Sequence, residues 1–133
     1  MTRERQLQLL LRALGTLDLL AFFAVFMPYD WMAAAHASLG MGELPQAPVV
    51  DYLARSASLM YAQHGAVFLF LSRDVRHYRD LICLMAVIAL ISGGIMLAID
   101  LLAPIPLFWT IIEGPGYVVL ATMVLVLARR TAS

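Results

Sequence analysis

The sequence predicts an all-α fold: a bundle of four transmembrane helices with both ends of the chain in the cytoplasm. Of the 133 residues, 62% are hydrophobic and only 14% are charged, whereas soluble domains are about 45–50% apolar. Four apolar stretches are long enough to cross a hydrocarbon core of about 30 Å as helices. Arginines flank these stretches on one side only, as the positive-inside rule requires of a membrane protein.

The predicted spans are separated by three connections, of which only the first is long. The spans cover residues 9–27, 52–71, 81–102 and 107–127. Five helix-breaking residues interrupt the first connection, namely Pro28, Gly40, Gly42, Pro45 and Pro48. Within this outer loop, Trp31 to Leu39 is predicted to form a short interfacial helix, anchored by Tyr29 and Trp31.

The distribution of arginine predicts the orientation, because all nine basic residues are arginines. Eight of them form three groups on one side of the spans: Arg3, Arg5 and Arg12, then Arg73, Arg76 and Arg79, then Arg129 and Arg130. The opposite side carries Asp30, Glu43, Asp51 and Asp100. We therefore predict cytoplasmic termini in a bacterial cytoplasmic membrane.

A cleaved signal peptide is the competing interpretation of the first apolar stretch. Arg3 and Arg5 precede it, and Ala33–Ala35 or Ala35–Ala37 offers a small-residue cleavage site. The stretch is longer than a usual signal core and contains Asp18. These two features favour a retained span.

Several classes of function are excluded or disfavoured. The net charge is zero and lysine is absent, so no basic surface is available for nucleic acid. Cys83 is the only cysteine, and His36, His64 and His77 fall at different depths, so we predict neither a disulfide nor a metal site. The motifs of serine hydrolases, zinc proteases, P-loops and dinucleotide folds do not occur. No catalytic residue is predicted, and a non-enzyme is favoured.

Asp18 and His64 form a predicted polar pair inside the membrane. An ionisable group at this depth costs about 2.5–3.5 kcal/mol, so it needs a partner or a use. Both residues lie near the middle of their spans, at similar depth. One interpretation is a proton-accepting pair or a polar anchor for a ligand; the other is an interhelical hydrogen bond that orients two helices.

A second polar group is predicted in the outer half of the bundle, around the ninth arginine. Asp51, Arg55 and Ser58 recur at helical spacing on one face of the second span. Ion pairs of Arg55 with Glu113 or Asp100 are expected there. Two interpretations stay open for this group.

The first interpretation is a packing seam, because Ala54, Ser58 and Ala62 let helices approach closely. The second is a ligand pocket floored by Tyr61 and His64 and covered by the short outer helix. In the fourth span, the Gly114-Pro115-Gly116 sequence predicts a kink or an unwound turn.

The chain resembles a group of small uncharacterised bacterial membrane proteins, broadly DoxX-like. The resemblance rests on Gly15-Thr16-Leu17-Asp18, on residues 39–45 (LGMGELP), on residues 51–56 (DYLARS) and on Glu113-Gly114-Pro115. It implies four transmembrane helices and an association with quinone-linked oxidoreductases. No catalytic residue is implied.

Three functions are compatible with these observations. The first is a binding or accessory protein of the bilayer whose outer pocket holds a quinone or a lipid as its ligand. The second is a structural subunit of a larger membrane complex, including a homo-oligomer. The third is an intramembrane enzyme or proton-coupled carrier that uses Asp18 and His64.

Overall fold

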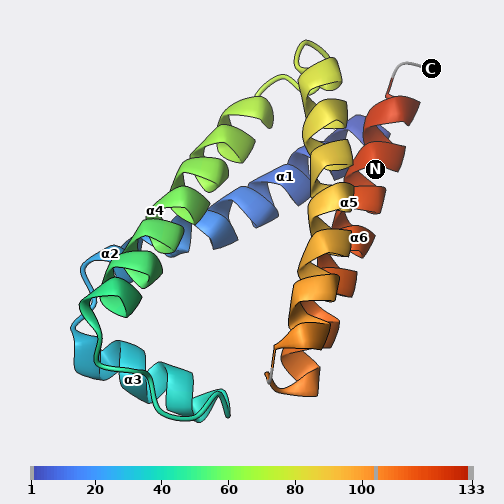
Figure 1. Cartoon of the computed structure of the whole chain (residues 1–133). Coiled ribbons are helices and arrows are strands. Elements are labelled where there is room, and N and C mark those ends of the chain that lie inside the picture. The colour runs from blue at the N-terminus through green and yellow to red at the C-terminus, as the bar shows by residue number, and fades with distance from the viewer. Residues whose placement is uncertain (1, 104, 132–133) are drawn as a thin grey trace. The chain divides into compact units, whose positions relative to one another are not determined.

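The computed structural model describes residues 2–103 and 105–131, and it is helical throughout (Figure 1). No strand occurs in these two ranges, so the all-α prediction is confirmed. The helices are α1 (Arg3–Leu20), α2 (Phe22–Val25), α3 (Tyr29–Ser38), α4 (Pro48–Leu71), α5 (Arg79–Leu102) and α6 (Leu107–Arg130).

The prediction of four transmembrane helices is wrong. Among the described residues, three helical stretches are long and apolar enough to span a membrane: Arg3–Val25, Arg79–Leu102 and Leu107–Arg130. Helix α4 is 24 residues long, the same length as α5 and α6. Its polar side chains, including Arg55, Gln63 and His64, lower its hydropathy below that of the three spans. The prediction counted α4 as a span because of its length, but its hydropathy is too low.

The three apolar stretches show that the chain is a membrane protein. Their large apolar side chains lie mostly on the surface; Phe23, Ile91 and Ile112 are 70%, 61% and 65% exposed. In water this exposure would oppose folding, because burial of apolar area is its main driving force. In a bilayer the same side chains contact lipid.

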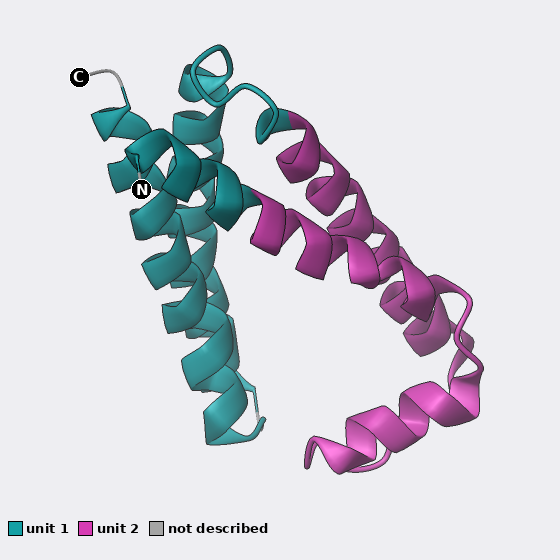
Figure 2. Ribbon diagram, turned by 180° about the vertical axis from the view of Figure 1, so that it is seen from behind, with its two compact units in different colours: residues 1–11, 71–133 teal, residues 12–70 magenta. Residues whose placement is uncertain are grey.

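The chain divides into two compact units, shown in Figure 2. Unit 1 consists of Met1–Leu11 and Leu71–Ser133, and unit 2 consists of Arg12–Phe70. Helix α1 contributes its first part to unit 1 and its remainder to unit 2. Each unit is built around a pair of long helices.

In unit 1, α5 and α6 run antiparallel and pack through glycines (Figure 1). A Cβ on Gly114 would lie 2.8 Å from the Cβ and 3.0 Å from the Cα of Leu97, and one on Gly93 would lie 3.1 Å from the Gly114 carbonyl oxygen. Small residues at such contacts let helix backbones approach closely. Helix α6 continues through Pro115 without interruption, so it contains no unwound turn.

Side-chain hydrogen bonds bring three arginine-bearing segments together at one end of unit 1. Arg76 donates from Nε to the Glu4 carboxylate at 2.9 Å, which joins the 72–78 connection to the start of α1. Arg79 donates from Nε to the carbonyl oxygen of Ala128 at 3.1 Å, which joins the start of α5 to the end of α6. We call this region, with Arg3, Arg5, Arg73, Arg76, Arg79, Arg129 and Arg130, the arginine end.

In unit 2, α1 and α4 cross with their backbones in contact. A Cβ on Gly65 would lie 2.5 Å from the carbonyl oxygen of Gly15 and 2.6 Å from the backbone nitrogen of Leu19. Both distances are shorter than real Cβ contacts, and both involve backbone atoms, which cannot rotate away. Only glycine fits at this crossing.

The connection between α1 and α4 contains a short helix and is stabilised by a hydrogen bond of its own. A short helix is present where one was predicted at Trp31 to Leu39, as α3. Tyr29 donates its hydroxyl to the carbonyl oxygen of Leu44, so the segment after α3 folds back along it. Gly40 and Gly42 have φ of 73° and 82°, in the left-handed region that favours glycine.

Gly65→Ala should destabilise the protein by about 1–3 kcal/mol, the usual cost of overpacking a tight contact. Gly94→Ala is the matched control, because a Cβ on Gly94 would meet nothing within 4 Å. Gly94 lies in α5, which has the same length as α4. Unfolding in detergent micelles, followed by circular dichroism, measures both variants. Equal stability of the two would contradict the proposed crossing.

Candidate functional site

The structure brings Asp18 and His64 together at the crossing of α1 and α4. The Nδ1 atom of His64 lies 2.8 Å from the Oδ2 atom of Asp18, and the His64 ring contacts the Phe68 ring at a tilt of 50°, with 4.2 Å between centroids. A Cβ on Gly65 would lie 3.0 Å from the Asp18 Cβ. The glycine contact therefore brings the helices close enough for a short aspartate to reach the imidazole.

This pair satisfies two polar side chains within one unit. Their side chains are 21% and 33% exposed, so the hydrogen bond is partly shielded from its surroundings. An interhelical hydrogen bond of this kind orients helices and is worth about 0.6 kcal/mol on average in membrane proteins, with a maximum near 1.7. The hydrogen bond between Asp18 and His64 joins α1 to α4 and so fixes their relative orientation. A role in proton acceptance stays a prediction.

Each of the three guanidinium nitrogens of Arg55 donates a hydrogen bond to a protein acceptor. Its Nε donates to both carboxylate oxygens of Asp51 at 3.0 Å, and its terminal nitrogens donate to the carbonyl oxygens of Val25 and Met27. These two carbonyls end α2 and begin the connection to α3. The hydrogen bond to Asp51 raises the pKa of Arg55 above its ordinary value, so the group stays charged. Arg55 closes the end of α2 onto α4.

Two other residues predicted for the outer pocket, Ser58 and Glu113, have partners within their own helices. The Ser58 hydroxyl donates to the carbonyl oxygen of Ala54 in its own helix, at 2.8 Å. Trp109 donates from Nε1 to the Glu113 carboxylate, one turn along α6, at 2.6 Å. Asp100 is only 5% exposed, and among the described residues its Oδ2 atom has no hydrogen-bond partner. Tyr61 is 43% exposed on α4.

The predicted pairs of Arg55 with Glu113 and Asp100 join different units. Arg55 belongs to unit 2, whereas Glu113 and Asp100 belong to unit 1. Those pairs, and a pocket that combines them, stay predictions. The observed partners of Arg55 show that its charge is already balanced by Asp51 within α4.

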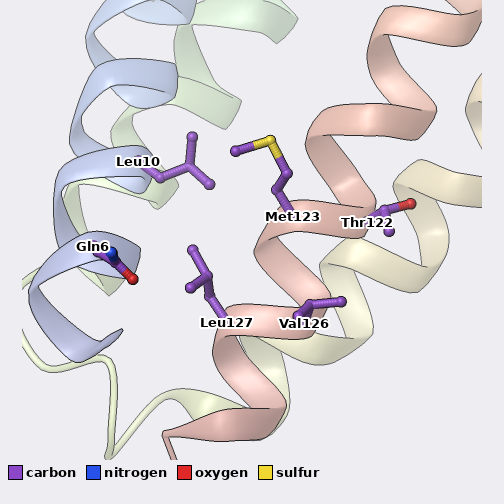
Figure 3. Close-up of a pocket in the computed structure, with 6 residues that line it drawn as sticks. All are labelled: Gln6, Leu10, Thr122, Met123, Val126 and Leu127. Carbon is purple, nitrogen blue, oxygen red and sulfur yellow. The ribbon is translucent and has the colours of Figure 1, made fainter. Parts of the chain in front are cut away.

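A groove of about 480 Å³ lies in unit 1 between the start of α1 and the second half of α6 (Figure 3). In Figure 3, Leu10 and Met123 point toward one another, and Leu127 faces the space between the helices. The lining is mainly apolar and consists of Gln6, Leu10, Thr122, Met123, Val126 and Leu127. Such a volume is within the usual range of about 300–1,000 Å³ for small-molecule sites.

Sequence reasoning missed this groove and the glycine crossing. Thr122 is a polar residue among apolar ones in the second half of α6, which was the available signal for the groove, whereas Gln6 lies among other polar and charged residues at the start of α1. For the crossing, Gly15 lies three residues before Asp18, and Gly65 follows His64 directly. A small residue near each half-buried polar group indicates a close helix approach.

The fold and the groove define the class of protein: a small helical membrane protein with an apolar site between helices. No protein-family model, curated protein or solved structure matches the chain. The DoxX-like resemblance therefore stays a prediction.

Arg55→Lys should lower the unfolding free energy by about 1–3 kcal/mol. Lysine retains the charge but cannot reproduce the fixed fork that bonds Asp51 and two carbonyls at once. Arg129→Lys is the control, because Arg129 is exposed at the end of α6. Equal unfolding midpoints in micelles would contradict the structural role of Arg55.

The Asp18–His64 hydrogen bond should appear as a coupling energy of about 0.5–2 kcal/mol in a double-mutant cycle. Asp18→Ala, His64→Ala and the double variant are compared by unfolding in micelles. If the two single effects add, the pair makes no net interaction. A coupling in this range would support the helix-orienting interpretation.

Proposed function

We propose that the protein is a non-enzymatic binding protein of the membrane, which holds a quinone or a lipid in the groove between α1 and α6. The observation that carries this proposal is the groove itself. It is apolar, it has room for an alkyl chain or a ring, and it lies between two helices that are apolar enough to contact lipid. Gln6 supplies an amide for a polar part of the ligand.

The groove replaces the outer pocket around Arg55 as the site of binding. The Arg55 guanidinium donates to Asp51, Val25 and Met27, so a ligand would have to displace hydrogen bonds within the protein. In the groove, a ligand would only have to displace bulk lipid from the side chains of Leu10, Met123 and Leu127. Exchange of one apolar neighbour for another has little cost.

The membrane is proposed to be a bacterial cytoplasmic membrane, with the arginine end facing the cytoplasm. The start of α1, the start of α5 and the end of α6 then lie on the cytoplasmic side, and the residues between α1 and α5 lead the chain back to that side. Support comes from the meeting of Arg76 with Glu4 and of Arg79 with the end of α6 in one region. Concentration of arginine at one end of a membrane unit is what the positive-inside rule describes.

A structural subunit of a larger membrane complex is the second candidate. The observation in its favour is the wide apolar surface of α5, on which Leu84, Ile91 and Ile95 are each more than half exposed. Such a surface accommodates either lipid or another helix. Stoichiometric partners after purification in mild detergent would favour this function.

Leu127→Trp should fill the groove and remove the retained molecule. Ile112→Trp is the matched control: it makes a similar change on α6 at a residue that is 65% exposed and outside the groove. The protein is purified in mild detergent, and lipids and quinones are extracted and quantified per mole of protein. The expected result is a loss of one bound molecule in Leu127→Trp only. Equal retention by both variants would contradict the proposal.

A further inference from the structure

We infer that the occupant of the groove is an anionic phospholipid, with its phosphate held by Arg3 and Arg130 and an acyl chain against Leu10, Met123 and Leu127. This inference rests on the proposed function and names the class of its ligand. Three features of unit 1 carry it: the spacing of residues on two helices, the direction of those helices, and the charges at the arginine end.

The first feature is the face that α1 contributes. Arg3, Gln6 and Leu10 follow one another at intervals of three and four residues, so they share one face of the helix. Gln6 and Leu10 line the groove. At about 1.5 Å per residue, Arg3 lies about 4.5 Å beyond Gln6 along the axis. Moving along this face toward the start of α1, the side chains change from apolar to amide to cation.

The second feature is the matching face of α6. Met123, Leu127 and Arg130 are separated by four and three residues, and the first two line the groove. Arg130 therefore stands about one helical turn beyond Leu127 on the same face. Arg3 opens α1 and Arg130 ends α6, and the contacts of Glu4 with Arg76 and of Arg79 with Ala128 gather both helix ends at the arginine end. Both cations thus lie at the same mouth of the groove.

The third feature is the balance of charge at this mouth. Arg76 pairs with Glu4, and Arg79 pairs with Asp80, at 2.9 and 3.5 Å. Arg3 and Arg130 form no ion pair with any described residue. Arginine binds phosphate oxygens through two parallel N–H groups, which is the strongest hydrogen bonding available to it. Two such groups above an apolar groove match a phosphate that is joined to acyl chains.

A phospholipid fits this arrangement better than the other possible occupants. A quinone ring carries no charge, so it would use Gln6 but leave both arginines without a role. A helix of a partner or of a second copy would need carboxylates at the position of the two arginines. Phospholipid phosphates lie at the boundary of the hydrocarbon core, where arginines that flank a span are also found.

The experiment measures lipid selectivity in two double variants of equal charge. R3Q/R130Q removes the cations on the groove faces. R5Q/R129Q is the matched control. It removes two arginines from the same helix turns, and Arg5 lies about 200° around α1 from Arg3 while Arg129 lies about 100° around α6 from Arg130. Both proteins are titrated with phosphatidylglycerol or phosphatidylcholine in micelles, and bound lipid is counted by native mass spectrometry. Circular dichroism checks the fold.

Wild-type protein and R5Q/R129Q should prefer phosphatidylglycerol, and R3Q/R130Q should lose about tenfold or more of this preference. Each arginine beside an anionic headgroup raises the affinity about fivefold. The loss of two therefore lowers the preference by more than about tenfold. Equal loss in both variants would overturn the inference, because it would show general surface charge. An unchanged preference in R3Q/R130Q would overturn it as well.

The L127W variant separates this inference from the proposed function. If L127W abolishes binding of both lipids while R3Q/R130Q affects neither, the groove binds its ligand without the arginines, and only the phosphate assignment fails. If L127W binds both lipids as the wild type does, the groove is not a binding site, and the proposed function fails with it. Retention of a quinone by R3Q/R130Q but not by L127W would assign the groove to a quinone instead.

Discussion

Gly15 and Gly65 bring the backbones of α1 and α4 into direct contact, and the polar interactions of unit 2 depend on that contact. With no Cβ at Gly65, the Gly15 carbonyl oxygen and the Leu19 nitrogen can approach it closely. A short side chain such as Asp18 then reaches His64 without extending. Any larger residue at position 65 would push the helices apart, and the hydrogen bond would lengthen and weaken.

This constraint also explains why α4 differs from the other long helices. Polar side chains in a membrane protein need partners that protein rather than lipid supplies. His64 forms a hydrogen bond with Asp18. Arg55 donates hydrogen bonds to the carboxylate of Asp51 and to the carbonyl oxygens of Val25 and Met27. Helix α4 is thus less apolar than the three spans, and its polar side chains form hydrogen bonds within unit 2. In unit 1, where Gly93 and Gly114 also provide a close approach, α5 and α6 keep their apolar surfaces for lipid.

The two polar regions of the chain consequently differ in what they can offer a ligand. Arg55 is bonded within unit 2, and its fork of donors is directed at protein acceptors. At the arginine end, Arg3 and Arg130 lie three positions along α1 and α6 from the groove residues Gln6 and Leu127, and they form no ion pair with described residues. A charge matched by a neighbour stabilises the fold, whereas an unmatched charge beside a groove is available for binding.

The sequence by itself determined the helical class, the membrane environment, the short helix after the first span and the one-sided distribution of arginine. Each of these follows from composition or from periodicity along a single helix. Only the tertiary structure decided that α4 packs on α1, that Gly15 and Gly65 form the crossing, and that Gln6 and Leu10 share a groove with Met123 and Leu127. These features depend on which faces of distant helices meet. Spacing within a helix specifies a face, but the partner of that face is chosen by packing among several helices of similar apolar character.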